Sequence, residues 1–206
     1  ILGANALGIK NILCITGDSV KAGDQQNTKA VHEFESVKLL KQIQSFNNGI
    51  DPTYELLSDH RTEIFAGAAA DPSYKNLKTI KMRTEQKKEA GARFIQTQMI
   101  MDKKYLIDFC DEISKPLNLP VLAGVFLLKS YKNALFINKF VPGANIPDQI
   151  LNRLKESNNP GEEGINIAAE QVREFIAISQ GVHIMAVKSE HLIPEILKRA
   201  EINLEY

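Results

Sequence analysis

The chain has 206 residues, of which 44% are hydrophobic and 24% are charged. Lysine plus arginine number 25, as do aspartate plus glutamate, so the formal net charge at pH 7 is zero. A chain without net charge has no long-range attraction for nucleic acid or an acidic membrane surface. Because no apolar run approaches the roughly 20 residues of a membrane helix and no signal-peptide pattern opens the chain, we expect a cytoplasmic protein with no nucleic-acid or membrane partner.

Two cysteines and two of the histidines are the first residues to consider as metal ligands. Cys14 and Cys110 each lie inside an apolar pattern, which favours reduced, buried thiols over a disulfide framework or a metal site. His183 and His191 show no ligand spacing with the cysteines or with each other. The sequence therefore predicts no metal site. It favours a position for His183 in the core or directly behind the residues of the functional site.

The first predicted strand is the apolar run from Asn11, which ends in Thr-Gly-Asp at 16–18. A polar stretch at 19–33 follows, and a loop of this length is often functional. Apolar residues from Phe34 to Ile43 then predict a helix of roughly three turns.

The next predicted strand covers 64–70, and its small residues, Gly67 to Ala70, would let a flat ring lie against the backbone. Leu77, Ile80 and Thr84 predict the inner face of a charged helix that ends at Gly91.

A short third strand follows Gly91 and ends in three polar side chains, Gln96, Thr97 and Gln98. Gln96 and Gln98 share a face because side chains alternate along a strand. Asp102 is well placed to cap the following helix, whose apolar positions keep a helical period to Leu117.

The second half of the chain repeats this plan. Residues 120–128 predict a fourth strand that is buried on both faces, and 182–187 a fifth. Between them we predict a helix from about Lys132 to Val141, a helix opened by Pro147, a solvent turn at 158–161 and a long helix at 165–179. A last helix is predicted to start at Lys188.

Five strands, each followed by helix, indicate an α/β fold, either a doubly wound sheet or part of a (βα)8 barrel. No glycine-rich dinucleotide fingerprint follows the first strand, which favours the barrel. In a barrel the chemistry lies at the carboxyl ends of the strands. The predicted site is therefore lined by residues 16–18, Ala70 and Asp71, Gln98, 129–133 and Lys188.

Several motifs stand in one order along the chain: Asn11-Ile-Leu-Cys-Ile-Thr-Gly-Asp18, Gly67-Ala-Ala-Ala-Asp-Pro72, the segment from Lys87 to Gln98 with Asp102, Val141-Pro-Gly143, and Gly181-Val-His-Ile-Met-Ala-Val187. Together they resemble the methylenetetrahydrofolate reductase family, in the style of acetogens and related anaerobes. The resemblance covers essentially the whole chain, and several motifs in one order are more specific than any one of them.

The resemblance implies a flavin-containing (βα)8 TIM barrel. Such an enzyme reduces 5,10-methylenetetrahydrofolate to 5-methyltetrahydrofolate in one-carbon metabolism, which serves methionine biosynthesis among other pathways. FAD or FMN would be the cofactor, and NAD(P)H or an electron-donor protein would supply electrons. A homo-oligomer or a larger complex is expected.

The chain resembles strands four to eight of that barrel, about five of its eight βα units. We therefore expect residues 1–206 to be the C-terminal part of a single flavin-binding domain, with the first three units and the family's general-acid glutamate outside this sequence. Five units cannot close an eight-stranded barrel. The alternative is an incomplete, non-catalytic portion that needs a partner or its N-terminal part.

The resemblance also assigns roles to single residues. Asp18 matches a catalytic carboxylate between flavin and folate, which would lower the flavin potential and stabilise a cationic iminium form of the substrate, although a capping role is the alternative. Gln98 matches a glutamine that binds folate and nicotinamide, since its amide offers a donor and an acceptor to a pterin edge. Asn133 stands where a folate-binding glutamine is common. Lys188 and Ser189 replace an Asn-Arg pair, and Lys188 would supply the cation that assists folate binding.

For the cofactor, the implied residues are Thr16, Gly17 and Asp18 at the first strand end, His32 in the loop and Lys87. Lys87 matches a lysine that contacts the flavin phosphate, although a solvated helix face explains it equally well.

Three departures from the family pattern bear on ligand binding. Asp71 stands in the place of a histidine that contacts FAD in many members, and Gly67 in that of a tyrosine, which weakens the case for FAD and makes FMN a serious possibility. Ile137 replaces an aromatic ring that packs on folate or nicotinamide.

Overall fold

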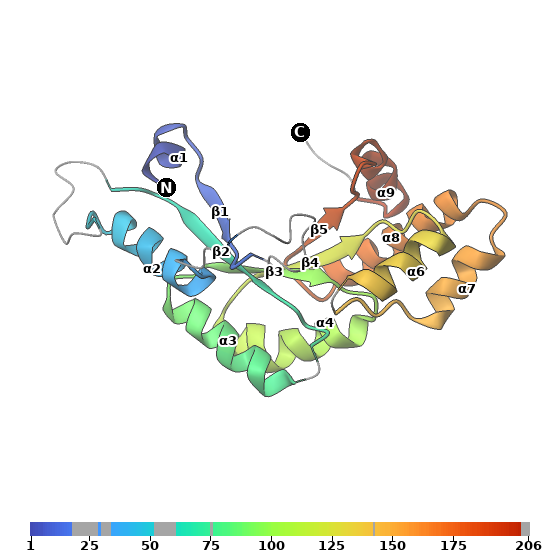
Figure 1. The fold of residues 1–206 in the computed structure, drawn as a ribbon, viewed down its shortest axis with the longest axis horizontal. Helices are drawn as coiled ribbons and strands as arrows, with labels where there is room; N and C mark the ends of the chain where they lie inside the picture. Colours follow the sequence, from blue (N-terminus) through green and yellow to red (C-terminus); the bar gives the residue numbers. More distant parts are fainter. Residues whose placement is uncertain (18–28, 30–33, 52–60, 75, 142, 203–206) are drawn as a thin grey trace. The chain divides into compact units, whose positions relative to one another are not determined.

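The computed structural model describes residues 1–17, 29, 34–51, 61–74, 76–141 and 143–202. Its strands are β1 (Asn11–Cys14), β2 (Phe65–Ala70), β3 (Phe94–Met99), β4 (Val121–Phe126) and β5 (Gly181–Met185). They form one sheet in the order β1-β2-β3-β4-β5 (Figure 1), and the β1–β2 and β4–β5 pairs are parallel. The α/β prediction is confirmed. A doubly wound sheet reverses its strand order at a switch point, whereas the order of these described strands contains no reversal.

Helices alternate with the strands, as the sequence predicts. They are α1 (Leu2–Ala6), α2 (Ser36–Asn47), α3 (Leu77–Glu89), α4 (Lys103–Phe109), α5 (Lys115–Leu117), α6 (Tyr131–Phe140), α7 (Asp148–Glu156), α8 (Pro160–Ile176) and α9 (Ile193–Arg199). A π-helical turn, η2 (Cys110–Ser114), joins α4 to α5, and a 3-10 turn, η3 (Glu190–Leu192), precedes α9. Within the described part of the chain, none of these helices has the length and apolarity to cross a membrane.

The chain packs as two compact units. Unit 1 comprises Ile1–Ala69 and Met82–Ile95, and unit 2 comprises Ala70–Lys81 and Gln96–Tyr206. Each unit has its own buried core.

In unit 1, α2 packs on β1 through buried residues that include Leu40 and Ile43. The helix was predicted at 34–43, but Phe34 lies outside it and is 55% exposed. The helix instead continues to Asn47, whose side chain donates to the Ile64 carbonyl at 2.8 Å and accepts from the Ile64 amide at 3.0 Å. These two hydrogen bonds to the residue before β2 hold the extra turn of the helix. The local sequence pattern did not predict that turn, because Ile64 lies 17 positions from Asn47.

The space beside Gly67 is filled by the chain itself. A Cβ built on Gly67 would lie 2.2 Å from the ring of Phe94, so only glycine leaves room for that ring. Phe94 also stacks on Phe65, with ring centroids 5.6 Å apart, and the guanidinium of Arg93 lies 5.5 Å from the Phe65 ring centroid. The predicted flat ring is therefore a side chain of β3 packed on β2.

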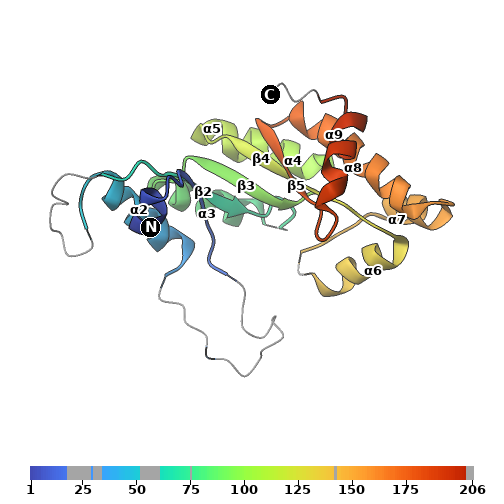
Figure 2. The same cartoon turned by 90° about the horizontal axis from the view of Figure 1, so that it is seen from above.

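In unit 2, α8 covers β4 and β5 (Figure 1), and α9 packs on α8 (Figure 2). β4 and β5 pair from Leu122 with Gly181 to Phe126 with Met185. Gly164 brings α8 onto the end of β4, because a Cβ at this position would lie 1.7 Å from the Leu128 carbonyl oxygen. Backbone contact of this kind fixes the carboxyl end of β4 against the helix.

Several predicted boundaries need correction. α8 begins at Pro160 rather than Ile165, because Asn159 caps it by accepting from the Glu162 amide and proline suits the first helical position. Lys188 does not start the last helix and lies in a turn before η3. Leu77 is 39% exposed and so does not share the buried face of Ile80 and Thr84.

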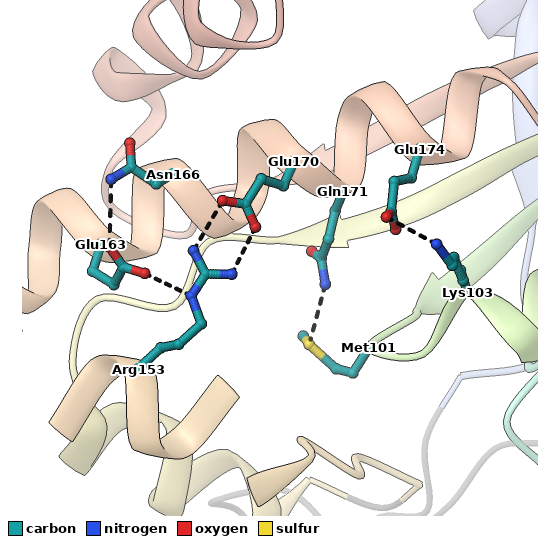
Figure 3. Close-up of polar contacts among 8 residues, drawn as sticks. All are labelled: Met101, Lys103, Arg153, Glu163, Asn166, Glu170, Gln171 and Glu174. Atoms are coloured by element: carbon teal, nitrogen blue, oxygen red, sulfur yellow. Dashed lines mark hydrogen bonds and ion pairs between the residues drawn. The ribbon is translucent and has the colours of Figure 1, made fainter. Parts of the chain in front are cut away.

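Two arginines tie α7 and α9 to α8 (Figure 3 shows the first). Arg153 of α7 donates to both carboxylate oxygens of Glu170, at 2.6 and 2.9 Å, and to Glu163 at 2.7 Å. Arg199 of α9 donates to Asn166 at 2.8 Å, and Asn166 donates in turn to Glu163. The two arginines thus belong to one polar network along α8.

Candidate functional site

The polar end of β3 divides into one structural residue and one exposed residue. Thr97 is buried, and its hydroxyl accepts from the Gly124 amide and donates to the Gln98 carbonyl, both at 2.8 Å. Gly124 is needed for this approach, since a Cβ there would lie 2.4 Å from the Gln98 carbonyl oxygen. Thr97 therefore ties β3 to β4.

The Gln98 side chain is exposed, and the described residues provide it with no hydrogen-bond partner. Gln96 is partly exposed, while Ile95 and Thr97 between and beside them are buried, so the two glutamines share a face as predicted. The carbonyl oxygen and the NH₂ group of the Gln98 side chain are thus both available to a ligand at the carboxyl end of β3.

Asn133, in the first turn of α6, is partly engaged in capping. Ser130 caps the helix by accepting from the Asn133 amide at 3.1 Å, and the Asn133 side-chain oxygen accepts from the Lys129 amide at 3.2 Å. The Asn133 NH₂ group has no partner among the described residues, so this side chain can still donate hydrogen bonds.

The end of β5 forms a tight turn around Lys188. The Ser189 amide donates to the Ala186 carbonyl at 2.7 Å, and Lys188 adopts a left-handed backbone with φ +57°. The amide of Lys188 donates to Glu190 at 3.0 Å, and the Lys129 ammonium donates to the Val187 carbonyl. Lys188 is exposed, and its ammonium forms no ion pair within the described chain.

These residues follow three neighbouring strands of unit 2. β3 adjoins β4, with the Ile100 amide donating to the Gly124 carbonyl at 2.9 Å, and β4 runs parallel to β5. The carboxyl ends of the three strands therefore carry Gln98, Lys129 with Asn133, and Lys188. Together they offer amide groups and a cation that no other described residue engages, which suits a ligand with a hydrogen-bonding edge and a negative charge.

Ile137 is buried in the core of unit 2. It packs in a cluster of buried residues: Met101, Leu128, Ala134, Ile146, Leu151, Leu154 and Ile167. Its neighbours Phe136 and Phe140 are 58% and 59% exposed, and their ring centroids lie 4.7 Å apart. The sequence reasoning missed this exposed aromatic pair because it considered only the position of Ile137.

In unit 1, Thr16 and Gly17 follow β1, while Asp18 and His32 lie outside the described residues. The Thr16 hydroxyl donates to the Ser36 hydroxyl and accepts from the Ser36 amide, both at 3.2 Å, so it helps to begin α2. Gly17 has φ +80°, and no atom of the described residues, its chain neighbours aside, lies within 4 Å of a Cβ built there. The described part of the chain therefore leaves its backbone open to a close approach.

Lys87 does not lie on a solvated helix face, which was the alternative interpretation of this residue from the sequence. Its ammonium donates to the Ala69 carbonyl at 2.7 Å near the end of β2. Burial, with a smaller effect from Arg83, lowers the pKa of Lys87. No described carboxylate forms an ion pair with it, so this half-buried cation retains two N–H groups for an anion.

Asp71 also differs from an ordinary surface carboxylate. Burial raises its pKa, although the Ser73 amide donates to it at 2.9 Å and opposes that shift. Its other oxygen would lie 2.9 Å from a Cβ built on Gly143, so the carboxylate packs against the glycine of the Val-Pro-Gly motif. The structure thus joins two motifs that lie far apart in the sequence.

A family model described as methylenetetrahydrofolate reductase matches residues 1–201. The chain belongs to the methylenetetrahydrofolate reductase family. No curated protein matches it.

Among solved structures, the chain is similar to an uncharacterized protein from Clostridium thermocellum that binds two copies of 5-methyl-5,6,7,8-tetrahydrofolic acid. The TM-score is 0.50 and the identity 19%, over 68% of this chain and 53% of that chain. The present chain therefore spans about half the length of that protein, and at this identity the likeness concerns the fold.

The cysteines of this methylenetetrahydrofolate reductase family member are free and buried, which confirms that prediction. His183 is partly buried, and desolvation lowers its pKa. Among the described residues, no group of three histidine, cysteine or acidic side chains is arranged to hold a metal.

One pocket of about 190 Å³ lies in unit 1. It is lined by Ile43, Gln44, Asn47, Asn48, Ile64, Ala66, Gly91 and Arg93. Ile64 and Arg93 precede β2 and β3, so this pocket adjoins the amino ends of the strands. Active sites of barrel enzymes lie at the opposite ends.

Proposed function

We propose that the protein is a flavin-dependent methylenetetrahydrofolate reductase of the type found in acetogens and related anaerobes. It would reduce 5,10-methylenetetrahydrofolate to 5-methyltetrahydrofolate, with this chain forming five units of a (βα)8 barrel. The observation that carries the proposal is the family match over residues 1–201, together with free polar groups at the strand ends where barrel enzymes bind substrate.

The substrate would lie across the ends of β3, β4 and β5. The pterin ring presents alternating donors and acceptors, which the Gln98 amide can pair with on both sides. The NH₂ group of Asn133 would donate a further hydrogen bond. The folate tail ends in carboxylates, and the Lys188 ammonium is the cation placed to receive one. The folate bound by the Clostridium thermocellum protein supports this ligand class.

A flavin, FAD or FMN, would supply hydride to the one-carbon unit when bound, and NAD(P)H or a donor protein would reduce it. Lys87 fits a phosphate of such a cofactor, because its half-buried ammonium has no described ion-pair partner. The open backbone at Gly17 fits a close approach by the same group. Asp18 would place its carboxylate near the flavin and stabilise positive charge on the substrate.

The test replaces each of two glutamines of β3 in the full-length protein. Gln98→Leu removes the amide proposed to hold the pterin and should weaken 5-methyltetrahydrofolate binding about tenfold or more, since one lost hydrogen bond in a desolvated site costs about 1.4 kcal/mol. Gln96→Leu is the matched control on the same face and should change binding less than about threefold. Calorimetric titration gives the dissociation constants. Equal effects of the two substitutions, or no effect of Gln98→Leu, would contradict the assignment.

A further inference from the structure

One peptide group at the end of β5 is held at both its ends by side chains of opposite charge. The group is the one between Val187 and Lys188. The Lys129 ammonium donates to its carbonyl oxygen, and the Glu190 carboxylate accepts from its N–H at 3.0 Å. Because these two atoms belong to a single rigid plane, the two bonds together fix how that plane is turned.

The orientation fixed in this way is an unusual one. Lys188 has φ +57°, the left-handed region, which costs an L-residue other than glycine, asparagine or aspartate free energy and persists only where neighbouring groups enforce it. The Ser189 amide, bonded to the Ala186 carbonyl at 2.7 Å, and the Ser189 hydroxyl, bonded to the Lys188 carbonyl at 2.8 Å, close the turn around it. Without the two charged groups, the peptide would be free to turn over and Lys188 would relax to an ordinary φ.

The charges suit the peptide they hold. A cation at the carbonyl oxygen and an anion at the N–H both match the direction of the peptide dipole, and hydrogen bonds to ionised groups are about twice as strong as neutral ones. Lys129 also lies close enough to Glu190 to help lower the pKa of that carboxyl, after the larger effect of its backbone hydrogen bonds. We call Lys129, Glu190 and this peptide group the β5 clamp.

The β5 clamp uses the Lys129 ammonium and leaves that of Lys188 unengaged. Lys129 comes from the end of β4 and crosses to the end of β5, so it also holds the two strand ends together. The side chain whose direction depends on the clamp is that of Lys188, which is exposed and forms no ion pair with a described residue.

We propose that Lys129 and Glu190 are positioning residues that aim the Lys188 ammonium at the carboxylate tail of the folate. The inference rests on the proposed function, since folate is the carboxylate-bearing ligand. Lys129 acts here through the backbone and touches no ligand atom, and Lys188 is the residue that meets the ligand.

The experiment compares two probes on the full-length protein. These are 5-methyltetrahydrofolate, which has the carboxylate tail, and 6-methyltetrahydropterin, which lacks it. Lys129→Met removes the donor to Val187 while keeping the length of the side chain. It should weaken 5-methyltetrahydrofolate binding about fivefold, as Lys188→Ala does, and leave 6-methyltetrahydropterin binding unchanged. Lys129→Arg, which keeps a cationic donor, should restore the affinity to within about twofold of wild type.

Four outcomes overturn the proposal. The double substitution Lys129→Met with Lys188→Ala should bind no more weakly than Lys188→Ala, so additive losses mean that Lys129 contacts the ligand itself. Equal losses for both probes mean a general structural role. Unchanged affinity in Lys129→Met removes the positioning role while the proposed function stands, whereas wild-type protein that binds neither probe overturns the proposed function as well.

Discussion

Both cysteine side chains are placed where ionisation is unfavourable. Burial raises the pKa of Cys14 and of Cys110 to about 11, because a thiolate loses its hydration inside the protein. Asp111 adds to this shift at Cys110, and Lys115 opposes it. Since the thiolate is the reactive form, these residues are predicted to be inert in the native state.

We predict that iodoacetamide at pH 8 labels neither cysteine in the native full-length protein over a time in which both react in denaturant. Mass spectrometry of the digested protein gives the extent of labelling at each site. Fast native labelling of Cys14 or Cys110 would show that the thiol is exposed or activated and would contradict the burial.

At the level of single residues, the sequence identified positions that make particular contacts, but it did not predict which residues they contact. The polar end of β3 was identified, but the role of Thr97 was not, because its partner Gly124 lies 27 positions further along. The room beside Gly67 was predicted, whereas the occupant, Phe94, is set by strand packing. The cap at Asp102 was predicted correctly, since a local hydrogen bond to the Lys104 amide at 2.8 Å defines it.

Among the elements, α8 is placed by one glycine. Gly164→Ala would put a methyl group 1.7 Å from the Leu128 carbonyl oxygen, so the helix or the end of β4 must move. We expect a loss of about 1–3 kcal/mol in the free energy of unfolding. Gly161→Ala in the same helix is the control, because its Cβ would meet its nearest atom at an ordinary 3.6 Å.

Urea denaturation of the two alanine variants measures this difference. Gly161→Ala should leave the midpoint unchanged or raise it, since alanine favours the helix more than glycine does. Equal midpoints for both variants would show that α8 does not press on the Leu128 backbone.

The Arg153 network holds α7 against α8 (Figure 3) and depends on pH. The hydrogen bond from Arg153 lowers the pKa of Glu170 below its usual 4.5. A carboxylate with a depressed pKa stabilises the fold above its unfolded pKa, and the stabilisation is lost as pH falls through the folded value. The effect is therefore complete at neutral pH and is lost progressively in acid, as pH falls from the usual 4.5 through the lower folded pKa of Glu170.

Arg153→Met should lower the free energy of unfolding at pH 7 by about 1 kcal/mol, a modest value because the Glu170 side chain is 45% exposed. The difference from wild type should shrink as pH falls below the usual 4.5 of a glutamate, because protonation of Glu170 removes the charge that Arg153 pairs with. Lys103→Met is the control, because its ion pair with Glu174 of α8 is exposed on both sides. Denaturation curves at pH 7 and pH 3.5 that show no such difference would contradict the role of Arg153.

At the level of elements, the strands and helices could be predicted because hydrophobic periodicity is local. Their ends could not, because they depend on distant partners, as with Asn47 and Ile64 at the end of α2. The turn at Lys188 was missed for the same reason, since a lysine gives no local signal for a left-handed backbone and the groups that enforce it include Lys129 of the preceding strand end.

For the whole molecule, regular alternation of strand and helix was enough to predict an α/β fold, and the strand order follows the chain. The sequence also predicted Gln98, Asn133 and Lys188 at one edge of the sheet, and in the structure all three belong to unit 2. What each side chain does there was less predictable, because capping engages the Asn133 oxygen and only the structure reveals it. The family match over residues 1–201 supports the chemistry that we propose for this edge.

The proposed reaction can be tested by mixing the oxidised, flavin-loaded full-length protein with 5-methyltetrahydrofolate under anaerobic conditions and recording the flavin absorbance. A flavin-dependent methylenetetrahydrofolate reductase can run its reaction backwards, so we expect the flavin to bleach and 5,10-methylenetetrahydrofolate to appear in equal amount. A protein that carries flavin but shows neither bleaching nor product with this folate would contradict it.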